Sequence, residues 1–351
     1  MTVPVSPSVT AVVCSRNGAR TIGACLAALD RQTVRARTQV VVVDDGSTDA
    51  TAAIARSFEV ELVCHGHNRG IGAARNTGAA RARAPVVAFT DDDCLPEPGW
   101  LEALLRAHGR PSVVGVGGPV VAARTTNLVL QYLDAYPPLA PLELDLAAHP
   151  RLAGRIVLYL RRAWSDAPPE GARAVLAFPG ANMSFTRAAL AAVDGFDEGI
   201  RFGSDDEDLC SRLRRAVPDG LLWLDPDAVV RHDFAGTLVD LLRRNYAYGR
   251  GHARAFLVER ERRWPIVFPT PLAVAAMAVG WRRSPRRLLI PLVVTALLPQ
   301  GPLSALRHHQ LDRLGFTGLR LCEEAAHDVG MLTGVVAHRR RRSAAHRSKR
   351  Q

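Results

Sequence analysis

Between Val9 and Val116 the chain alternates short, β-branched apolar runs with longer segments of helical spacing. The apolar runs are expected to be strands and cover residues 10–14, 39–44, 60–64, 85–90 and 112–116. Helices are expected between them, at about 20–31, 48–57, 71–83 and 98–108. Strands that are apolar on both faces and alternate with helices indicate a parallel sheet covered on both sides. We therefore predict an α/β fold with a mostly parallel central sheet, and ligand sites at the carboxyl ends of its strands.

The remainder of the chain is less regular. Residues 118–178 carry PPLAP at 137–141 and APPEG at 167–171, and are where a second substrate site is expected. After His232 a basic helix at about 237–262 leads to two apolar runs, 266–281 and 288–299. Both runs contain proline and are shorter than the roughly 20 apolar residues that a straight membrane span needs. Three interpretations stay open: a membrane hairpin or re-entrant pair, interfacial contact, or ordinary core or dimer helices.

Charge divides unevenly along the chain. Residues 1–234 hold 24 basic and 27 acidic residues, whereas residues 235–351 hold 21 basic and 7 acidic ones. The last 13 residues alone carry seven positive charges and no acid. Such a tail attracts polyanions, but no aromatic residues interleave it and no DNA-binding motif accompanies it. With apolar runs just upstream, an anionic membrane surface is a simpler expected partner than nucleic acid.

The cysteines and the amino-terminal residues indicate in which cellular compartment the protein is expected. The six cysteines are scattered, without CxxC pairs or His/Cys pairs at zinc-ligand spacing, and we interpret them as reduced thiols. The amino-terminal segment MTVPVSPSVTAVVC has no positive region followed by a long apolar stretch and a cleavage site, so it does not read as a signal peptide. A cytoplasmic location is expected.

Two acidic motifs follow predicted strands. In DDGSTD (44–49), Gly46 accounts for a turn, and Ser47 or Thr48 for a helix cap. The adjacent Asp44 and Asp45 at the end of a buried strand repel each other unless a donor group or a cation is present, which favours ligand binding. An EF-hand is excluded because its glycine belongs at the sixth loop position, and here it is the third.

The second acidic motif is Asp91-Asp92-Asp93, directly after the strand ending in Thr90. Burying three unpaired carboxylates is strongly unfavourable, so a hard divalent cation completed by phosphate oxygens is the economical partner. A solvated loop is the alternative.

Two further segments carry candidate groups. Arg75 lies near the start of a helix in NRGIGAARN (68–76), where it either faces a diphosphate or is a surface arginine; the GxGxxR pattern follows the third strand, the wrong place for a dinucleotide fingerprint. Asp205 and Asp206 occupy the first turn of a predicted helix, where one can cap and the other can accept a proton. His232 is a possible metal ligand or hydrogen-bond donor, or a structural histidine.

Taken in order, these motifs resemble the family-2 inverting glycosyltransferases of the GT-A fold. The resemblance covers roughly residues 8–234 and rests on VTAVVCSRN, DDGSTDAT, NRGIGAARNTG, FTDDD, PGANMSFTRAAL with GFDE, and DDEDLCSRL. It implies that Asp45, with Asp44 nearby, contacts the nucleobase or ribose of a nucleotide-sugar. Cys14 and Arg16, at the end of the first strand, are implied to line the same donor site.

The resemblance implies the remaining roles as well. Asp91 and Asp93 would hold Mg²⁺ or Mn²⁺ on the donor diphosphate, which His232 approaches and Arg75 helps to neutralise. Asp206 would be the general base that deprotonates an acceptor hydroxyl, so that one displacement inverts the anomeric centre. Three residues are expected on the acceptor or sugar side: Gly180, Asn182 and Asp205.

The expected reaction is metal-assisted transfer from a nucleotide-diphosphate donor, most commonly a UDP-sugar in this family, to a hydroxyl of a lipid-linked or small-molecule acceptor. No QxxRW motif follows the catalytic acid, which favours non-processive transfer, for example in cell-envelope glycan, glycolipid or natural-product glycosylation. The alternatives are a sugar nucleotidyltransferase and a non-catalytic membrane- or polyanion-binding protein.

The same reading divides the chain into domains. A glycosyltransferase domain is expected over 1–234, with a nucleotide-sugar-binding half at 8–117 and an acceptor half at 118–234. A helical, apolar, membrane-associated extension is expected over 235–338, and a basic disordered tail over 339–351. The enzyme would then lie at the inner face of the cell membrane.

Overall fold

The computed structural model describes residues 6–137, 171–200, 203–258 and 269–348, together with positions 151, 153, 154, 157 and 164. Within these ranges, no side chain of 254–258, 269 or 338–348 is described. Most of the segment 138–170, expected to contribute to the acceptor half, lies outside the described residues, as does the tail beyond Ser348. The chain divides into two compact units: Met1–Arg124 and Pro168–Phe234 belong to the first, and Thr125–Tyr136 and Ala235–Gln351 to the second.

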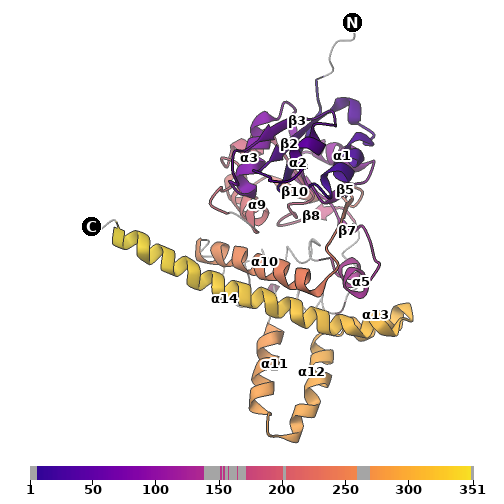
Figure 1. Ribbon diagram of the computed structural model, residues 1–351, viewed down its shortest axis with the longest axis vertical. Coiled ribbons are helices and arrows are strands. Elements are labelled where there is room, and N and C mark those ends of the chain that lie inside the picture. Colours follow the sequence, from indigo (N-terminus) through magenta and orange to yellow (C-terminus); the bar gives the residue numbers. More distant parts are fainter. Residues whose placement is uncertain are drawn as a thin grey trace. The chain divides into compact units, whose positions relative to one another are not determined.

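The first unit is built on an eight-stranded sheet of order β3-β2-β1-β4-β9-β6-β10-β8 (Figure 1). Its strands are β1 (Val9–Ser15), β2 (Thr38–Asp44), β3 (Glu61–Cys64), β4 (Val86–Asp91), β6 (Val113–Gly117), β8 (Arg173–Ala174), β9 (Met183–Thr186) and β10 (Leu221–Leu224). The pairs β1–β2, β2–β3, β1–β4 and β6–β10 are parallel. The predicted α/β class with a mostly parallel sheet is confirmed.

One strand that the βα alternation does not reveal lies in the middle of this sheet. β9 inserts between β4 and β6 and runs antiparallel to both. A second, three-stranded sheet has β11 (Val230–His232) between β5 (Cys94–Pro96) and β7 (Val120–Ala122). β5 begins at Cys94, directly after the aspartates at the end of β4, and His232 of β11 pairs with Cys94 in this small sheet.

Helices cover both faces of the large sheet. On one face lie α3 (Ile71–Arg81) and α9 (Asp205–Ala216), above a core to which β1, β4 and β9 contribute Val12, Phe89 and Phe185. On the other face α4 (Trp100–His108) packs against β6 and β4, and His108 Nε2 lies 2.9 Å from Ser184 Oγ. The other α-helices among the described residues of this unit are α1 (Ile22–Asp30), α2 (Thr51–Ala55) and α8 (Arg187–Ala191).

The second unit is helical. It contains α5 (Leu128–Ala135), α10 (Leu238–Val258), α11 (Pro269–Gly280), α12 (Ile290–Leu297), α13 (Gln300–His308) and α14 (Phe316–Ser348). α10 packs along α14 (Figure 1), and glycines permit the close approach: a Cβ at Gly249 would lie 2.0 Å from the His327 carbonyl, and one at Gly330 would lie 2.1 Å from the Tyr246 carbonyl.

Two boundaries differ from the sequence-based expectation. α5 belongs to the helical unit rather than to the acceptor half, because the Tyr132 hydroxyl donates to the buried carboxylate of Glu323 in α14. Residues 339–348, expected to be disordered, continue α14 as helix, and their Arg and Ala content favours propagation of an existing helix.

The apolar runs form separate short helices. Among the described residues no single helix is long and apolar enough to cross a bilayer. One pair, Pro285–Leu297 with Gln300–His308, meets the length and composition of a broken span and is bent by 64°.

Gly78 tests the packing of α3 on the sheet. A Cβ there would lie 2.2 Å from Val12 Cγ1 in β1. Helix propensity alone would make Gly78→Ala stabilising by about 1 kcal/mol. Because the overlap forces α3 away from β1, we expect Gly78→Ala instead to lower the free energy of unfolding by about 1–3 kcal/mol. Chemical denaturation measures the effect, with Gly23→Ala as the control.

In that control the new Cβ meets Ile54 Cγ2 at 3.5 Å, an ordinary contact, so Gly23→Ala should not destabilise the protein. Equal stabilisation by both variants would contradict the described packing of α3.

Candidate active site

Polar residues collect where the parallel strands β1, β2 and β4 end. Ser15 pairs in register with Asp44, and Cys14 pairs with Asp91. The next strand, β3, pairs Cys64 with Asp44 and is followed at once by His65. The parallel register thus brings acids from two separate sequence motifs, together with His65, to one edge of the sheet.

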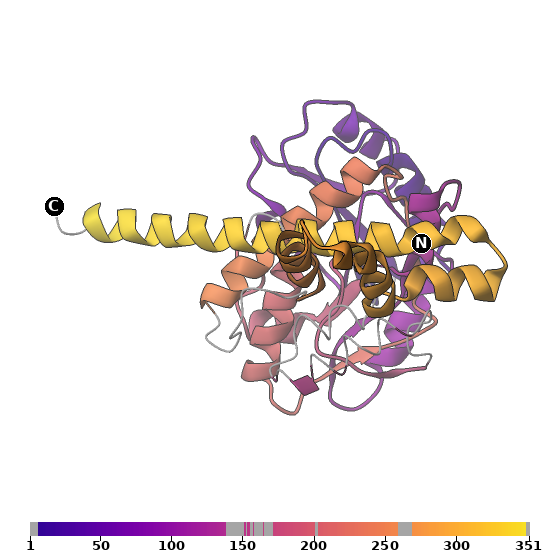
Figure 2. The same ribbon diagram turned by 90° about the horizontal axis from the view of Figure 1, so that it is seen from below.

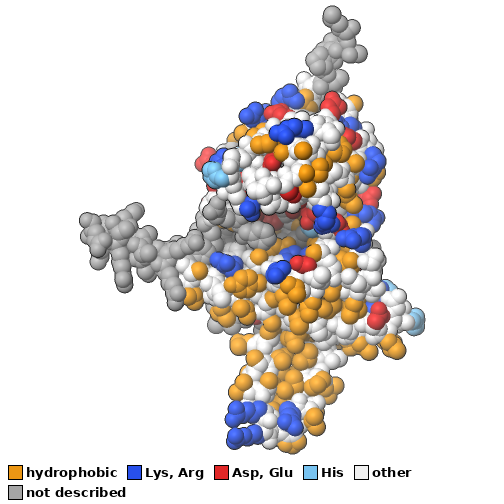
Figure 3. Space-filling model, in the orientation of Figure 1, with side chains coloured by type: hydrophobic (Ala, Val, Ile, Leu, Met, Phe, Trp, Pro, Cys, Tyr) orange, Lys and Arg blue, Asp and Glu red, His pale blue; other side chains and the backbone are white. Residues whose placement is uncertain are grey.

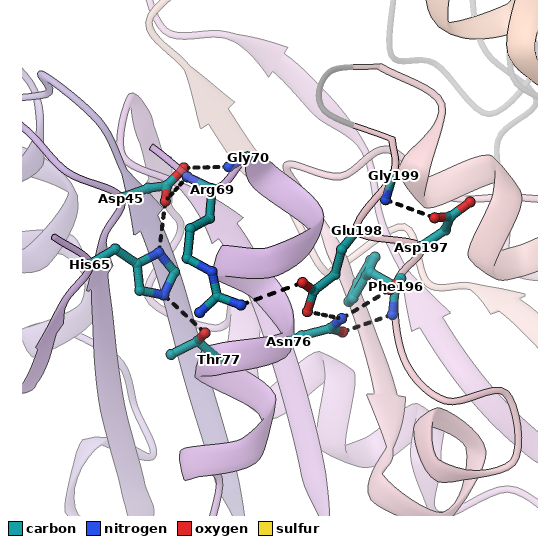
Figure 4. A network of polar contacts seen from close by, with 10 residues as sticks. All are labelled: Asp45, His65, Arg69, Gly70, Asn76, Thr77, Phe196, Asp197, Glu198 and Gly199. Atoms are coloured by element: carbon teal, nitrogen blue, oxygen red, sulfur yellow. Dashed lines mark hydrogen bonds and ion pairs between the residues drawn. The ribbon is translucent and has the colours of Figure 1, made fainter. Parts of the chain in front are cut away.

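Asp45 is fixed by the chain itself (Figure 4). Its Oδ1 accepts the Arg69 amide at 2.8 Å and lies 2.7 Å from His65 Nδ1, while its Oδ2 accepts the Gly70 amide at 2.8 Å. Burial opposes ionisation, but these hydrogen bonds outweigh it and hold the pKa of Asp45 below its ordinary value. Asp45 therefore anchors the start of α3, and its contact with a nucleobase or ribose, which the resemblance implied, stays a prediction.

Asp44 is the acid of this pair with bonding capacity left. Its Oδ1 accepts the Ser47 amide at 2.9 Å, the one hydrogen bond its side chain makes among the described residues. Gly46 makes the intervening turn with φ +73°, and a Cβ there would meet the His67 backbone at 2.6 Å. The DDGS motif thus contains one aspartate whose two carboxylate oxygens both accept backbone amides and one, 4% exposed, with a single hydrogen bond among the described residues.

The three aspartates after β4 point to different partners. Asp92 accepts a short hydrogen bond from the Ser15 hydroxyl, and Gly18 makes room for it, because a Cβ at Gly18 would lie 1.9 Å from Asp92 Oδ2. Burial and the neighbouring carboxylates raise the pKa of Asp92 and that of Asp93 to about 7 each. Asp91 instead accepts from Arg75 Nη2 at 3.1 Å.

Asp93 and His232 form the group best suited to a cation. His232 Nε2 lies 3.5 Å from Asp93 Oδ1, and the imidazole stacks on Phe234 with ring centroids 4.1 Å apart. Cys94 completes a trio whose ligand atoms all lie within 4.8 Å of one another. Burial raises the pKa of the Cys94 thiol well above its usual value, which makes the Asp93 oxygen and the His232 nitrogen the more accessible donors of this trio.

Arg75 joins the two acid clusters. Its Nη1 makes a short ion pair with Asp205 and its Nη2 one with Asp91, and the residue is 4% exposed. Burial disfavours the cation, but Asp205 and Asp91 more than compensate and raise the pKa of Arg75. Arg75 is therefore an internal cation between β4 and α9 and not a surface arginine, and its expected role beside a donor diphosphate stays a prediction.

Gly180 makes this arrangement possible and also orients Asp206. A Cβ at Gly180 would lie 2.5 Å from Arg75 Nη2, so only glycine leaves room for the guanidinium. The Gly180 amide donates to Asp206 Oδ2 at 2.6 Å. Desolvation, and then the charges of Asp205 and Glu207, raise the pKa of Asp206 to about 7. Asp206 remains partly exposed at the first turn of α9, where its Oδ1 accepts the Glu207 amide at 2.9 Å.

Three residues expected at the site are structural instead. Asn182 is fully buried: its Oδ1 accepts from Trp100 Nε1 at 2.8 Å, and its Nδ2 donates to the carbonyls of Ala228 and Pro119. Asp205 is 4% exposed and paired with Arg75, so it does not face an acceptor. Cys14 belongs to the apolar core, where burial raises its thiol pKa. Arg16 is exposed directly after β1, and its donor contact stays a prediction.

Sequence reasoning missed two polar residues that organise the site (Figure 4). His65 links Asp45 to Thr77, whose Oγ1 lies 3.0 Å from His65 Nε2. Asn76 exchanges hydrogen bonds with the backbone of Phe196, at 2.9 and 2.8 Å, and so ties α3 to the segment that precedes α9. His65 was detectable, because it follows a strand end as Asp44 and Asp91 do; Asn76 gave no such signal.

Comparison with known proteins agrees with this geometry. Residues 10–153 match the family model described as Glycosyl transferase family 2. This part of the chain is therefore similar to family-2 glycosyltransferase domains. Its solved structural relatives include a mannosyltransferase from Pyrobaculum calidifontis in complex with GDP-Man and Mn2+, with TM-score 0.59 and 22% identity, covering 93% of this chain and 87% of that one. The GT-A glycosyltransferase fold expected from the sequence is confirmed.

Curated relatives of this glycosyltransferase domain match over only part of their length. The pre-mycofactocin glycosyltransferase of Mycobacterium tuberculosis is 32% identical over 233 residues, which are 65% of this chain and 44% of that protein. Glycosyltransferase AglE of Haloferax volcanii is 37% identical over 120 residues, 32% of this chain and 40% of that protein. The chain thus spans less than half the length of these relatives.

Asn182→Ala tests the structural role assigned to Asn182. The change leaves the buried Trp100 Nε1 without its partner and removes the Asn182 hydrogen bonds to the Ala228 and Pro119 carbonyls, of which the Pro119 carbonyl still accepts the Val230 amide, so we expect the free energy of unfolding to fall by about 2–4 kcal/mol. Ser57→Ala, which removes one exposed hydrogen bond to the Ile54 carbonyl, serves as control and should change it by less than about 0.5 kcal/mol. If Asn182→Ala kept its stability and lost only activity, the result would instead support the expected contact of Asn182 with the sugar or the acceptor.

Proposed function

We propose that this protein is an inverting glycosyltransferase that moves one sugar from a nucleoside-diphosphate donor to an acceptor hydroxyl, with Asp206 as general base. The observation that carries the proposal is the placement of Asp206 beside the Arg75 bridge. That bridge ties α9, which bears the base, to β4, which leads into the candidate cation site. The base and the cation site are thus fixed relative to each other by a buried ion pair.

The chemistry of Asp206 suits proton abstraction from a hydroxyl. A carboxylate with its pKa raised to about 7 is a stronger base than an ordinary aspartate and is still largely ionised at slightly alkaline pH. The Gly180 amide holds one carboxylate oxygen in place, which limits the rotamers the base can adopt. The acceptor hydroxyl loses its proton to Asp206 as its oxygen attacks the anomeric carbon, so one displacement inverts that centre.

The residues of this chain fit a divalent cation. Asp93 offers a carboxylate oxygen, the donor that both Mn²⁺ and Mg²⁺ take when phosphate oxygens complete the shell, and the imidazole nitrogen of His232 favours Mn²⁺ over the harder Mg²⁺. A bound cation would supply positive charge to the donor diphosphate as it leaves. The Pyrobaculum calidifontis relative, whose title names GDP-Man and Mn2+, supports this assignment.

For the donor we propose a UDP-sugar, with Asp44 rather than Asp45 contacting its nucleoside, since Asp44 has the spare hydrogen-bonding capacity. The acceptor is a hydroxyl of a lipid-linked or small molecule, and transfer is non-processive. A panel of UDP-, GDP- and dTDP-sugars tested for Mn²⁺-dependent thermal stabilisation identifies the donor, because a ligand of the folded state raises its melting temperature. Release of the nucleoside diphosphate supports the proposal. Release of pyrophosphate from a nucleoside triphosphate and a sugar phosphate would show a nucleotidyltransferase instead.

Asp206→Asn tests the base. We expect it to keep donor-induced stabilisation and to lower the transfer rate by roughly 10²–10⁴-fold, because the amide cannot accept the proton. Asp208→Asn is the matched control: Asp208 lies on the same helix but pairs with Arg212, and its change should leave the rate nearly unaltered. A wild-type rate in Asp206→Asn would rule out this base.

The pH dependence follows from the raised pKa of Asp206. The protonated form cannot act as base, so the kcat/KM of the wild type should rise with pH and level off above about 7. An aspartate of ordinary pKa would place that rise near pH 4, and a profile flat from pH 5 to 8 would contradict the assignment.

Asp93→Ala tests the cation site. Removal of the carboxylate should raise the apparent Kd for the donor in Mn²⁺ by about tenfold or more, since even outer partners of a metal ligand cost 10–100-fold in metal affinity. Asp219→Ala, an exposed carboxylate on the loop after α9, is the control. Thermal shift with and without Mn²⁺ measures both, and equal metal-dependent shifts in the two variants would place the cation elsewhere.

A further inference from the structure

In the helical unit, α11 and α12 lie side by side as a hairpin that leaves the axis of α14 (Figures 1 and 2). We define the arginine-tipped hairpin as Thr270–Leu297. Its two helices are PTPLAVAAMAVG and IPLVVTAL, in which threonine is the only polar side chain. Its turn, 281–289, carries Arg282, Arg283, Arg286 and Arg287, all exposed.

The apolar side chains of the hairpin face outward. Val279 is 74% exposed on α11, and Leu288 and Leu292 are 76% and 67% exposed on the turn and α12. At 100° per residue, the exposed positions of α11 occupy more than half of its circumference. Figure 3 shows the result: hydrophobic side chains along the hairpin and basic ones at its tip. A helix that is apolar on most sides suits a lipid environment better than a one-sided protein groove.

Charge identifies the partner more closely. The sequence has no Asp or Glu from residue 262 to residue 311, so the four tip arginines have no acid within their own segment. A second copy docked through the same surface would bring eight such cations together, which like-charge repulsion opposes. Lipid phosphates and anionic headgroups supply the matching negative charge.

Length determines how the hairpin can meet a bilayer. The 12 residues of α11 extend for about 18 Å, against about 30 Å of hydrocarbon core. Tip-first insertion would leave the four guanidinium groups inside the hydrocarbon, a strongly unfavourable place for arginine. A hairpin lying along the interface keeps its arginines among the phosphates and its apolar residues at the acyl boundary.

We propose that the arginine-tipped hairpin binds the surface of an anionic lipid bilayer, lying in the interface with Arg282, Arg283, Arg286 and Arg287 on the headgroup phosphates. Two further leucines of this unit are exposed, Leu306 on α13 and Leu311 at the start of the 3-10 helix that follows it. The inference is independent of the transfer reaction, because binding to lipid needs no sugar donor. Along the sequence, the hairpin is also 60 or more residues from every proposed catalytic group except His232.

Co-sedimentation of the full chain with vesicles tests this surface. We expect binding to phosphatidylcholine vesicles containing about 25% phosphatidylglycerol, and much weaker binding to phosphatidylcholine alone. Arg286→Ser with Arg287→Ser should weaken partitioning by roughly 25-fold, at about fivefold per arginine near the surface. Leu288→Ser with Leu292→Ser should weaken it at least tenfold, because both leucines leave water on binding.

The matched control is Arg31→Ser with Arg37→Ser, two exposed arginines of the other unit, which should leave partitioning within about twofold. Far-ultraviolet circular dichroism establishes that each variant is folded, and donor-induced stabilisation reports the active site separately. In 1 M NaCl wild-type partitioning should fall at least tenfold, because salt screens the arginine contacts.

Four results would overturn the proposal. The first is equal vesicle binding by the tip variants and the control variant, and the second is vesicle binding that persists in 1 M salt, as an inserted hairpin would show. The third is complete loss of vesicle binding when residues 339–351 alone are removed. The fourth is dimerisation through the hairpin, detected by light scattering.

Discussion

The buried ion pairs of Arg75 hold the candidate active site together. A guanidinium taken out of water is unfavourable unless it is well paired, and here Asp205 and Asp91 supply the pairing from two different elements. Removal of either acid leaves a buried charge uncompensated, which typically costs 3–5 kcal/mol. The same pairs tie the start of α9 to the end of β4, so electrostatics fix the position of the base.

The surroundings of Arg75 then determine how each nearby acid behaves. Asp205 is committed to the ion pair, whereas Asp206, one residue later, keeps its carboxylate at a partly exposed position. The charge of Asp205 contributes to the raised pKa of Asp206, and Arg75 partly offsets it. Two consecutive aspartates thus acquire different roles because α9 turns one inward and the other outward. Gly180 serves both, leaving room for the guanidinium and donating its amide to Asp206.

Much of the fold could be predicted from the sequence, because strands buried on both faces and separated by helices have a distinctive pattern. The acids at the ends of β2 and β4 were predictable for the same reason. The sequence pattern could not show which residues far apart in the chain contact each other. The antiparallel insertion of β9, the burial of Asn182 against Trp100 and the division of labour between Asp44 and Asp45 depend on contacts between segments far apart in the chain. Arg75 was ambiguous because its acidic partners lie 16 and 130 residues away.

The most direct test of this account is a double-mutant cycle between Arg75→Met and Asp205→Asn, measured as free energies of unfolding. Arg75→Met leaves the buried carboxylate of Asp205 without its cation, and Asp205→Asn leaves Arg75 with Asp91 as its one remaining partner of the two, while the double change removes both members of the Arg75–Asp205 pair. The account predicts that the double variant is more stable than the sum of the single losses implies, by about 2 kcal/mol or more. Additive losses would show that the two side chains act independently and would contradict the central role of this ion pair.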